Sequence, residues 1–386
     1  LQEGRLCPAL SLYVVIDRAT QQVLSAETRA EQVQMAANLR HNLLDDDVTE
    51  AALAAGTGTF PFRDELGILW SFACALYDGR QQARIASGLK PETQSRADYS
   101  FYLDTLEDGT QRVRIEQRKR GSPLDKIVAE LMILANSTWG RMLADAGVPG
   151  IYRAQKAWGI NRTRMQTYPA PHEGLGVAQY AWSTSPLRRY VDLVNQWQIL
   201  AVAEHGITAK LVAPFKPKDA DLLAAVADFE GTYAAYAEHQ STMEKYWCLR
   251  WIQQENRTRM SATVLKEGMV RFDEIPLLTR VPELAQAARG TQVMLEIMGS
   301  DEIGLDLSVR VLELCAGGDA AALDSAALDE LEQEMAEGDP LAAEDIETPE
   351  EAPEARVGVT DAPSDTTPDA APDTSGEPDE TAPPAL

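Results

Sequence analysis

The sequence predicts an α+β protein, because helical and strand-like patterns occupy different stretches instead of alternating regularly. Amphipathic helical spacing dominates residues 65–255, whereas short alternating strands fill residues 261–314. An Asp-Gly turn between two strand-like runs adds a hairpin at residues 99–115. With 386 residues, the chain is long enough for two or three domains with cores of their own.

Composition argues against several classes of protein. The longest apolar runs, such as Val128–Ala135, contain a charge or are far shorter than the roughly 20 residues of a membrane-spanning helix. No basic-then-apolar leader opens the chain. The four cysteines form no Cys-x-x-Cys pair, which argues against a disulfide framework or a structural zinc site. We therefore expect a cytoplasmic protein with no membrane partner.

Most of the negative charge lies in a C-terminal tail. The formal net charge is −25, yet residues 315–386 contain 21 Asp and Glu against one basic residue, Arg356, so the rest of the chain carries only −5. Nine prolines and no aromatic residue in this tail predict disorder, with one short helix at residues 320–336. The tail is a solubility segment or an acidic competitor for a basic surface, and its partner stays open.

The first strand is expected at Pro8–Ile16, an almost continuous apolar run. Because this run begins so close to Leu1, we expect an incomplete chain. The three carboxylates at Asp45–Asp47 suggest a metal site, but adjacent side chains point in different directions. Asp47 and Glu50 instead fit a capping box that opens a helical turn at residues 51–54.

The middle of the chain predicts two helices with a hairpin between them. Helical spacing indicates an amphipathic helix at Glu65–Arg80 and another from Leu124 to about Ala144. The runs Tyr99–Leu103 and Val113–Ile115 flank the Asp108-Gly109 turn of the hairpin.

Two more helices are expected before the last strands. Ser185 is a good N-cap and Pro186 suits the first helical position, which predicts a helix beginning there. Asp219 starts the longest helix, whose apolar residues recur every 3.5 residues or so, a period that indicates lengthwise packing on a partner. The final segment predicts a small β-barrel through three short strands, Ala262–Leu265, Val293–Ile297 and Gly304–Val311.

Two arginines, Arg188 and Arg189, follow Ser185-Pro186. In the first turn of a helix the macrodipole disfavours cations, so their presence indicates an anion that both guanidinium groups bind. A phosphate at the helix N-terminus fits this requirement. The alternative is that the arginines pair with Asp192 or another carboxylate.

Glu130 interrupts the apolar run Ile127–Ala135, so its burial requires a partner. Arg188 or Arg153 is a candidate, and so is a ribose hydroxyl. A purely structural ion pair explains the residue equally well.

Three further positions have both a functional and a structural interpretation. Glu244, beside Trp247 on the longest helix, is a ligand contact or a surface carboxylate. Tyr99 and Phe101 share one face of a strand, where they stack on bases or fill a sheet core. His172 precedes a Gly-x-Gly stretch but lacks a second ligand at useful spacing, so it predicts neither a metal site nor a P-loop.

Four motifs, in this order, resemble the RNB domain of the ribonuclease II / ribonuclease R family: Glu130-Leu-Met-Ile-Leu-Ala-Asn136, Gly150-Ile-Tyr-Arg-Ala-Gln155, Gly174-Leu-Gly176 and Thr184-Ser-Pro-Leu-Arg-Arg-Tyr190. The resemblance implies a partial RNB catalytic domain at residues 1–258, with a mixed sheet and long helices. It further implies a small OB-type RNA-binding β-barrel at 259–314, followed by the disordered acidic tail at 315–386.

The resemblance also implies a function. RNB proteins are 3′→5′ exoribonucleases that use Mg²⁺ to hydrolyse single-stranded RNA to nucleoside 5′-monophosphates, here as a monomer. By position, Arg188 matches the catalytic arginine at the scissile phosphate. Glu130 and Glu244 match acidic residues near the terminal nucleotides, and Tyr99 or Phe101 falls in the region of the aromatic that stacks on the last base. The remaining candidate RNA-binding residues are Arg153 and Arg189.

The chain departs from the family pattern in its metal ligands. Family members hold their metal with clustered aspartates, and no Asp-x₅-Asp-x-Asp-Asp pattern occurs in this sequence. The Mg²⁺ ligands are therefore expected upstream of Leu1, with none in this chain, and the chain alone is expected to lack nuclease activity. The alternative function is a non-catalytic RNA-binding or regulatory pseudoenzyme on the same scaffold.

Overall fold

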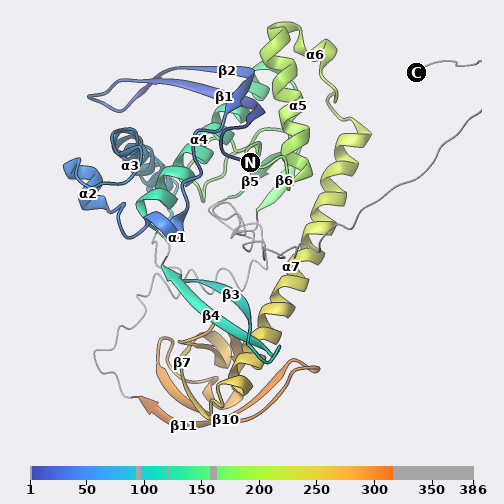
Figure 1. Ribbon diagram of the computed structural model, residues 1–386. Helices are drawn as coiled ribbons and strands as arrows, with labels where there is room; N and C mark the ends of the chain where they lie inside the picture. Colours follow the sequence, from blue (N-terminus) through green and yellow to red (C-terminus); the bar gives the residue numbers. More distant parts are fainter. Residues whose placement is uncertain (1, 93–96, 120, 157–162, 316–386) are drawn as a thin grey trace, which may run out of the picture. The chain divides into compact units, whose positions relative to one another are not determined.

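The computed structural model describes residues 2–92, 97–119, 121–156 and 163–315, which form a mixed α and β fold as the sequence predicts (Figure 1). The predicted acidic tail, with the helix expected at residues 320–336, lies outside the described residues. The domain boundaries at 258 and 314 stay predictions. In the described part of the chain, no helix is both long and apolar enough to cross a membrane.

Strands β1 (Leu6–Ile16) and β2 (Val23–Gln34) pair antiparallel as a long hairpin (Figure 1). β1 confirms the first predicted strand. The sequence pattern misses β2, because most of its side chains are polar and exposed. It therefore lacks the apolar alternation by which a half-buried strand is recognised.

Two short helices follow, α1 (His41–Leu44) and α2 (Glu50–Ala55). The predicted capping residue of α2 is wrong. Its N-cap is Thr49, whose side chain accepts a hydrogen bond from the Ala52 amide at 3.2 Å. Val48 is fully buried, and this anchor places Thr49, not Asp47, at the start of the helix.

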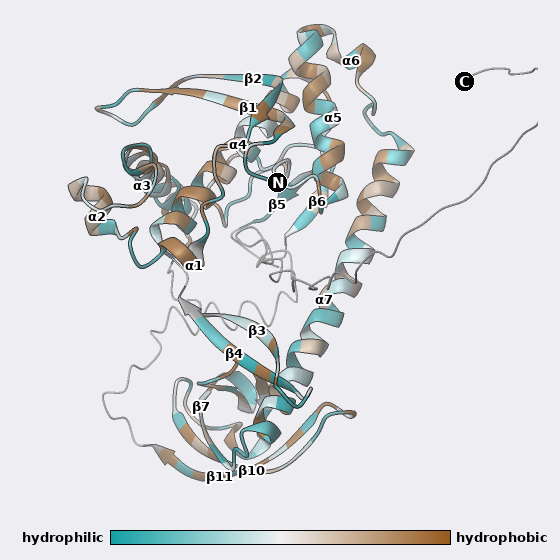
Figure 2. Ribbon diagram, viewed as in Figure 1, coloured by the Kyte–Doolittle hydropathy of each residue, from teal (hydrophilic) through white to brown (hydrophobic). Residues whose placement is uncertain are grey.

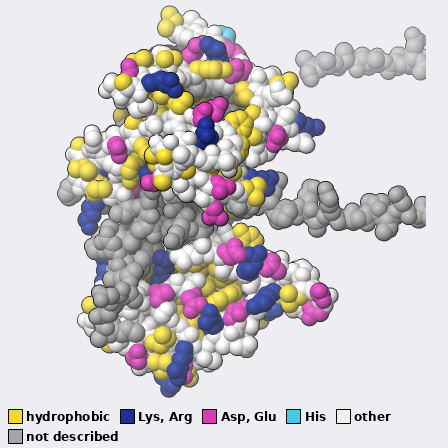
Figure 3. All heavy atoms as spheres, turned by 60° about the vertical axis from the view of Figure 1, so that its left-hand side comes forward, with side chains coloured by type: hydrophobic (Ala, Val, Ile, Leu, Met, Phe, Trp, Pro, Cys, Tyr) yellow, Lys and Arg dark blue, Asp and Glu magenta, His cyan; other side chains and the backbone are white. Residues whose placement is uncertain are grey.

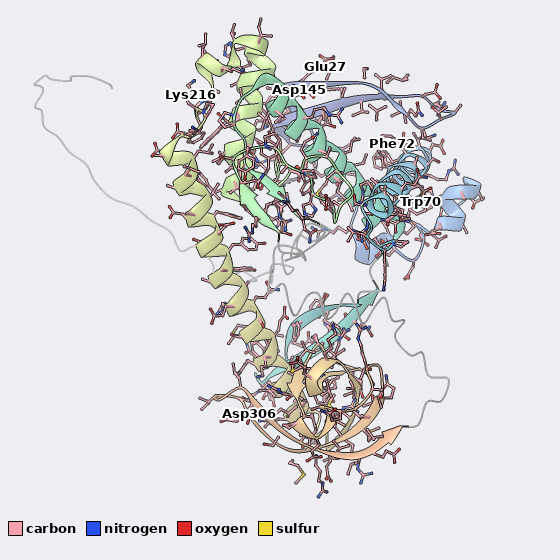
Figure 4. The ribbon with its side chains drawn as sticks, turned by 180° about the vertical axis from the view of Figure 1, so that it is seen from behind. Glu27, Trp70, Phe72, Asp145, Lys216 and Asp306 are labelled. Carbon is pink, nitrogen blue, oxygen red and sulfur yellow. The ribbon has the colours of Figure 1, made fainter. Side chains whose placement is uncertain are left out.

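Helices α3 (Arg63–Ala86) and α4 (Pro123–Ala146) confirm the two predicted amphipathic helices, and both extend beyond the predicted bounds. A capping box between Ser122 and Asp125 opens α4. The two helices share an apolar core that includes Trp70, which lies on α3 near Phe72 (Figure 4).

The predicted hairpin is confirmed in β3 (Ala97–Thr105) and β4 (Gln111–Lys119), and Figure 2 shows that much of it is hydrophilic. Its turn contains Gly109 with a φ of +81°, a conformation that favours glycine. The backbone of Val113 exchanges hydrogen bonds of 2.8 and 2.9 Å with the side chain of Gln254, so the hairpin is tied to the last helix.

A small antiparallel pair, β5 (Tyr152–Ala154) and β6 (Arg164–Gln166), precedes α5 (Tyr190–His205) and the short α6 (Ala209–Val212). The predicted start of α5 at Ser185 is wrong.

Residues 185–188 form a turn in which the amides of Arg188 and Arg189 donate to the Ser185 carbonyl at 3.2 and 3.0 Å. The Ser185 amide donates to the Asp192 carboxylate at 2.9 Å and holds the chain in this turn. Arg189 is consequently the N-cap residue of α5, and both arginines precede the helix.

The longest helix is α7 (Ala220–Gln254), and Asp219 is its N-cap as predicted. The predicted lengthwise packing is wrong. Within the described residues, α7 is buried only near its ends, where Leu222 and Val226 join one apolar core and three residues join another: Cys248, Leu249 and Ile252. Lys216 and Asp306 mark these two ends in Figure 4.

A five-stranded antiparallel sheet in the order β11-β10-β7-β8-β9 curls around the end of α7 (Figure 1). The three predicted strands are confirmed as β7, β10 and β11, whereas β8 and β9 are too short to give a recognisable pattern. The bounds are β7 (Arg259–Val264), β8 (Met269–Phe272), β9 (Leu278–Arg280), β10 (Gln292–Asp301) and β11 (Asp306–Cys315).

Candidate functional site

The buried carboxylate of Glu130 on α4 pairs with Arg80 of α3, and not with Arg188 or Arg153. The Arg80 guanidinium donates to both carboxylate oxygens, Nε to Oε2 at 2.8 Å and Nη2 to Oε1. Burial lowers the pKa of Arg80, but the hydrogen bonds and charge of Glu130, with the charge of Glu92, outweigh it, so the net pKa is raised. This bidentate pair fixes a charged arginine and a carboxylate between the two helices.

Arg80 also holds the loop at residues 172–177. Its Nη1 donates to the Leu175 carbonyl at 2.7 Å, and the Leu175 amide donates to Nδ1 of His172 at 3.2 Å. Gly176 has a φ of +71°, and a Cβ there would collide with the Arg80 carbonyl. The loop therefore reaches α3 only because glycine stands at this position.

His172 is neutral at physiological pH. Burial disfavours the imidazolium form, and the positive charges of Arg153, Arg84 and Arg80 add to this effect, so the pKa of His172 lies well below 6.5. The positive charge near His172 therefore comes from these arginines and not from the imidazole.

Trp182 contacts two of the candidate arginines, Arg153 and Arg189. Their guanidinium carbons lie 4.1 and 3.9 Å from the centroid of the Trp182 ring. All three side chains are at most 3% exposed. Cation–π contacts of desolvated arginines contribute about 2 kcal/mol each, so Trp182 helps to hold both charges inside the protein. Trp182 lies outside the four sequence motifs, and no pattern in the sequence identifies it as a candidate.

Arg189 forms a buried ion pair with Asp192, the alternative that the sequence left open. Its Nε donates to Oδ2 at 2.9 Å and its Nη2 to Oδ1 at 2.8 Å, with side chains 3% and 0% exposed. The same carboxylate accepts the Ser185 amide, so the pair fixes the turn at residues 185–188. Arg188, by contrast, is exposed at the end of this turn. The two neighbouring arginines therefore have different surroundings: one holds the turn and the other faces solvent.

Two buried asparagines attach the segment before this turn to the helices. Asn136 of α4 accepts the Ser183 amide at 2.9 Å and donates to the Thr184 hydroxyl at 3.4 Å. Asn195 of α5 donates to the Trp182 carbonyl at 2.7 Å. We name this connected set the Arg188 network: Arg80, Glu130, Asn136, Arg153, His172, Trp182, Ser185, Arg188, Arg189, Asp192 and Asn195.

No described contact joins Glu244 to the Arg188 network. Glu244 is half-buried on α7 and accepts a hydrogen bond from Gln240 at 3.0 Å. The α7 residue that contacts Trp182 is Phe229. At 1.5 Å per residue, Glu244 lies about 22 Å further along the helix.

Tyr99 and Phe101 face the terminal sheet. Phe101 packs against the apolar core of that sheet, and the Arg271 guanidinium carbon lies 5.8 Å from the Tyr99 ring centroid. Burial raises the pKa of Tyr99. These contacts agree with the sheet-core interpretation, and base stacking by either residue stays a prediction.

The residues that the structure describes do not fit a Mg²⁺ site. Within residues 2–92, 97–119, 121–156 and 163–315, no three His, Cys, Asp or Glu side chains are grouped so that they could hold a metal ion. Asp45–Asp47 are among these residues, so they do not form such a group either. We therefore assign no metal-dependent step to these residues.

The central part of the Arg188 network coincides with a known domain. Residues 158–205 match the family model of the RNB domain. This stretch contains Trp182, Arg188, Arg189 and Asp192. The resemblance to the RNB family is confirmed.

Relatives of this RNB-like chain are named as ribonucleases. Exoribonuclease II, mitochondrial, of Saccharomyces cerevisiae is 30% identical over 106 residues, covering 19% of this chain and 11% of the relative. Ribonuclease II, chloroplastic/mitochondrial, of Arabidopsis thaliana is 27% identical over 146 residues, covering 38% of this chain and 16% of the relative.

Solved structures of RNB enzymes share the fold. The structure of Mycoplasma genitalium RNase R in complex with double-stranded RNA aligns with a TM-score of 0.62 and 12% identity, over 81% of this chain and 61% of that chain. The Dss1 exoribonuclease of Candida glabrata aligns with a TM-score of 0.59 and 16% identity, over 80% of this chain and 43% of that one. The chain thus spans less than two thirds of each of these proteins, and at these identities the structural likeness shows the fold alone.

Proposed function

We propose that this chain is the RNA-holding part of a 3′→5′ exoribonuclease that acts on single-stranded RNA and releases nucleoside 5′-monophosphates. The observation that carries the proposal is the turn at residues 185–188. A buried ion pair fixes this turn so that it presents Arg188, a permanent cation, to solvent. The RNB resemblance and the ribonuclease names of the relatives support the same conclusion.

Within this proposal, Arg188 binds the scissile phosphate through its guanidinium fork. Arg189 and Asp192 position Arg188 through the turn. Glu130 is kept as a proposed contact to a ribose 2′-hydroxyl, the group that separates RNA from DNA. Because its carboxylate is buried and both oxygens accept from Arg80, this contact requires the surrounding residues to move. Arg153 contributes positive charge beside Trp182.

Three further RNA contacts are proposed at the far end of α7, at Glu244, Tyr99 and Phe101. They belong to nucleotides other than the one at Arg188, because about 22 Å of helix separates Glu244 from the Trp182 contact.

Mg²⁺, where bound, supplies charge neutralisation and an activated water. Its ligands are proposed to lie upstream of Leu1, since the described residues do not fit the ion. We therefore expect the isolated chain to bind RNA without hydrolysing it. We further propose that it is a monomer and that it is located in the cytoplasm.

A non-catalytic RNA-binding pseudoenzyme on the same scaffold is the second candidate. It is favoured by the sequence itself, in which the Asp-x₅-Asp-x-Asp-Asp pattern of the family does not occur. Both candidates share the Arg188 phosphate contact and differ only in hydrolysis by the whole protein.

The test is RNA binding by the full chain and by Arg188→Ala. We expect the variant to bind 5′-labelled oligo(A) about 10- to 100-fold more weakly, the effect of losing a hydrogen bond to a charged group. Arg29→Ala removes an arginine that is 51% exposed on β2, outside the residues proposed to bind RNA, and is the matched control. Equal affinities for all three proteins would refute the proposal. A Mg²⁺-dependent ladder that Arg188→Ala abolishes would show that the chain alone is active.

A further inference from the structure

One face of α7 carries a row of large side chains, of which only the first, Phe229, packs against an apolar core of the described residues. We name as the α7 stripe the residues Phe229, Tyr233, Tyr236, Met243 and Trp247. Their spacings of four, three, seven and four residues keep them on one side of a helix with 3.6 residues per turn. Successive rings are in contact: the Phe229 and Tyr233 centroids are 5.1 Å apart, and those of Tyr233 and Tyr236 are 6.2 Å apart.

Apart from Phe229, the α7 stripe contributes little to the apolar cores of the described residues. None of residues 227–247 is buried, and Tyr236 is 51% exposed. The residues that anchor α7 in the terminal sheet, such as Cys248 and Leu249, follow the stripe and project from another side of the helix. Tyr236 is exposed and the other four side chains are half-buried, so large side chains remain partly accessible along a helix that is fixed at both ends, which marks a binding surface.

Both ends of the α7 stripe meet residues already proposed to bind RNA. At one end, Phe229 packs edge-on against Trp182, with ring centroids 6.5 Å apart, and Trp182 contacts Arg153 and Arg189. At the other end, Glu244 precedes Trp247 by less than one turn. From Phe229 to Trp247 the stripe is about 27 Å long, enough for several nucleotides.

We infer that the α7 stripe is a stacking track for the bases of single-stranded RNA leading to the Arg188 network. This inference rests on the proposed function. The occupant is an RNA strand whose bases, not its phosphates, face the helix, because α7 carries five acidic and two basic residues. Glu238 comes nine residues after Phe229, on the opposite side, and Glu230 accepts the Met165 amide at 3.4 Å. Glu244 lies on the side of the stripe, where a contact to RNA is already proposed for it.

This geometry predicts that any of the four bases stacks on the α7 stripe. The stacking contribution to affinity should not change with salt concentration, because stacking neutralises no phosphate. Figure 3 shows acidic and basic side chains interspersed on one face of the molecule. The phosphate contact at Arg188 is different, since neutralising a phosphate releases counterions. The contacts at the α7 stripe and at Arg188 can therefore be distinguished by varying the length of the oligonucleotide and the salt concentration.

The experiment compares Tyr236→Ala with Tyr13→Ala, a control that removes a tyrosine 44% exposed on β1. Alanine preserves α7, since it is the strongest helix former. Full-length protein is titrated with a labelled trinucleotide and a 12-nucleotide oligo(A) at several salt concentrations. We expect Tyr236→Ala to bind the 12-mer at least about five-fold more weakly, with the trinucleotide affinity and the salt slope unchanged.

The outcomes separate this inference from the proposed function. If Tyr236→Ala binds the 12-mer as tightly as Tyr13→Ala does, while Arg188→Ala loses both oligonucleotides, the track is refuted and the proposed function stands. If Tyr236→Ala instead changes only the sedimentation coefficient, the stripe is a protein interface and the inference fails. If Arg188→Ala binds both oligonucleotides normally, the proposed function fails, and the track fails with it.

Discussion

The two main cores of the molecule are built on different principles. Of the buried polar and charged residues in the described part, all but Thr263 lie between Arg80 and Gln198, in and around the Arg188 network. The core of the terminal sheet consists of apolar residues such as Val270, Phe272 and Leu295, each 0% exposed. Apolar burial is enough to hold a small sheet on a helix. A buried arginine or carboxylate costs several kcal/mol unless it is paired, so each charge in the Arg188 network depends on its partner.

The two cores should also differ in how well they tolerate substitutions. In the sheet core, a substitution removes contacts that neighbouring side chains partly replace. In the Arg188 network, removing one partner leaves the other as an unpaired buried charge or polar group. The predictions below test whether the contrast holds.

The largest effect is expected for Asp192→Ala. The substitution leaves Arg189 buried without its carboxylate and should lower the free energy of unfolding by about 3–5 kcal/mol. It should also weaken RNA binding per folded molecule, because the Ser185 amide loses its acceptor. Urea unfolding and oligo(A) titration measure the two effects.

Two controls accompany Asp192→Ala. Leu295→Ala in the sheet core should cost about 2–5 kcal/mol of stability and leave RNA affinity per folded molecule unchanged. Asp104→Ala, which breaks a pair with Arg114 that is 45% exposed on both sides, should cost at most about 1 kcal/mol. A cost for Asp192→Ala no greater than that for Asp104→Ala would remove the contrast between the two cores.

A second, smaller effect is a pH dependence that only the Arg188 network should show. The pKa of His172 in the folded protein lies well below its unfolded value of about 6.5. Below pH 6.5 the unfolded chain therefore binds a proton that the folded protein does not, and stability falls as pH decreases by up to about 1.4 kcal/mol per pH unit. Stability above pH 7 is unaffected by this group.

His172→Gln should flatten the stability profile between pH 5.5 and 6.5. His239→Gln, which changes an exposed histidine on α7, should leave the profile as it is. Urea unfolding at a series of pH values measures both variants. The same slope in wild-type protein and His172→Gln would show that the network does not exclude the proton.

The contrast between the cores also explains what the sequence could predict. Apolar periodicity identifies α3, α4 and β1, since their buried positions recur at a fixed spacing. The same reasoning recognises that Glu130 needs a partner. It cannot identify Arg80, which lies fifty residues away on another helix and is brought close only by tertiary packing. Motif resemblance identified Arg188 as a candidate, because it depends on sequence and not on contacts.

Errors arose where one tertiary contact overrides a local preference. Ser185 and Pro186 favour a helix start, yet the Asp192 carboxylate binds the Ser185 amide and the Arg189 guanidinium, so α5 begins later. The regular spacing of large apolar residues in α7 predicts a packing seam, but periodicity does not distinguish a buried face from an exposed one.

The smallest effect is expected at the start of α2, where a tertiary contact again outweighs the local sequence preference. The capping-box pattern favours Asp47, whereas the structure uses Thr49, whose hydroxyl accepts the Ala52 amide. Thr49→Ala should therefore lower the free energy of unfolding by about 1 kcal/mol. Asp47→Ala should change it by less than about 0.5 kcal/mol, as for a surface substitution without a capping role. Chemical denaturation of the two variants decides between the caps. The reverse order of effects would mean that the local pattern, and not the burial of Val48, sets the start of the helix.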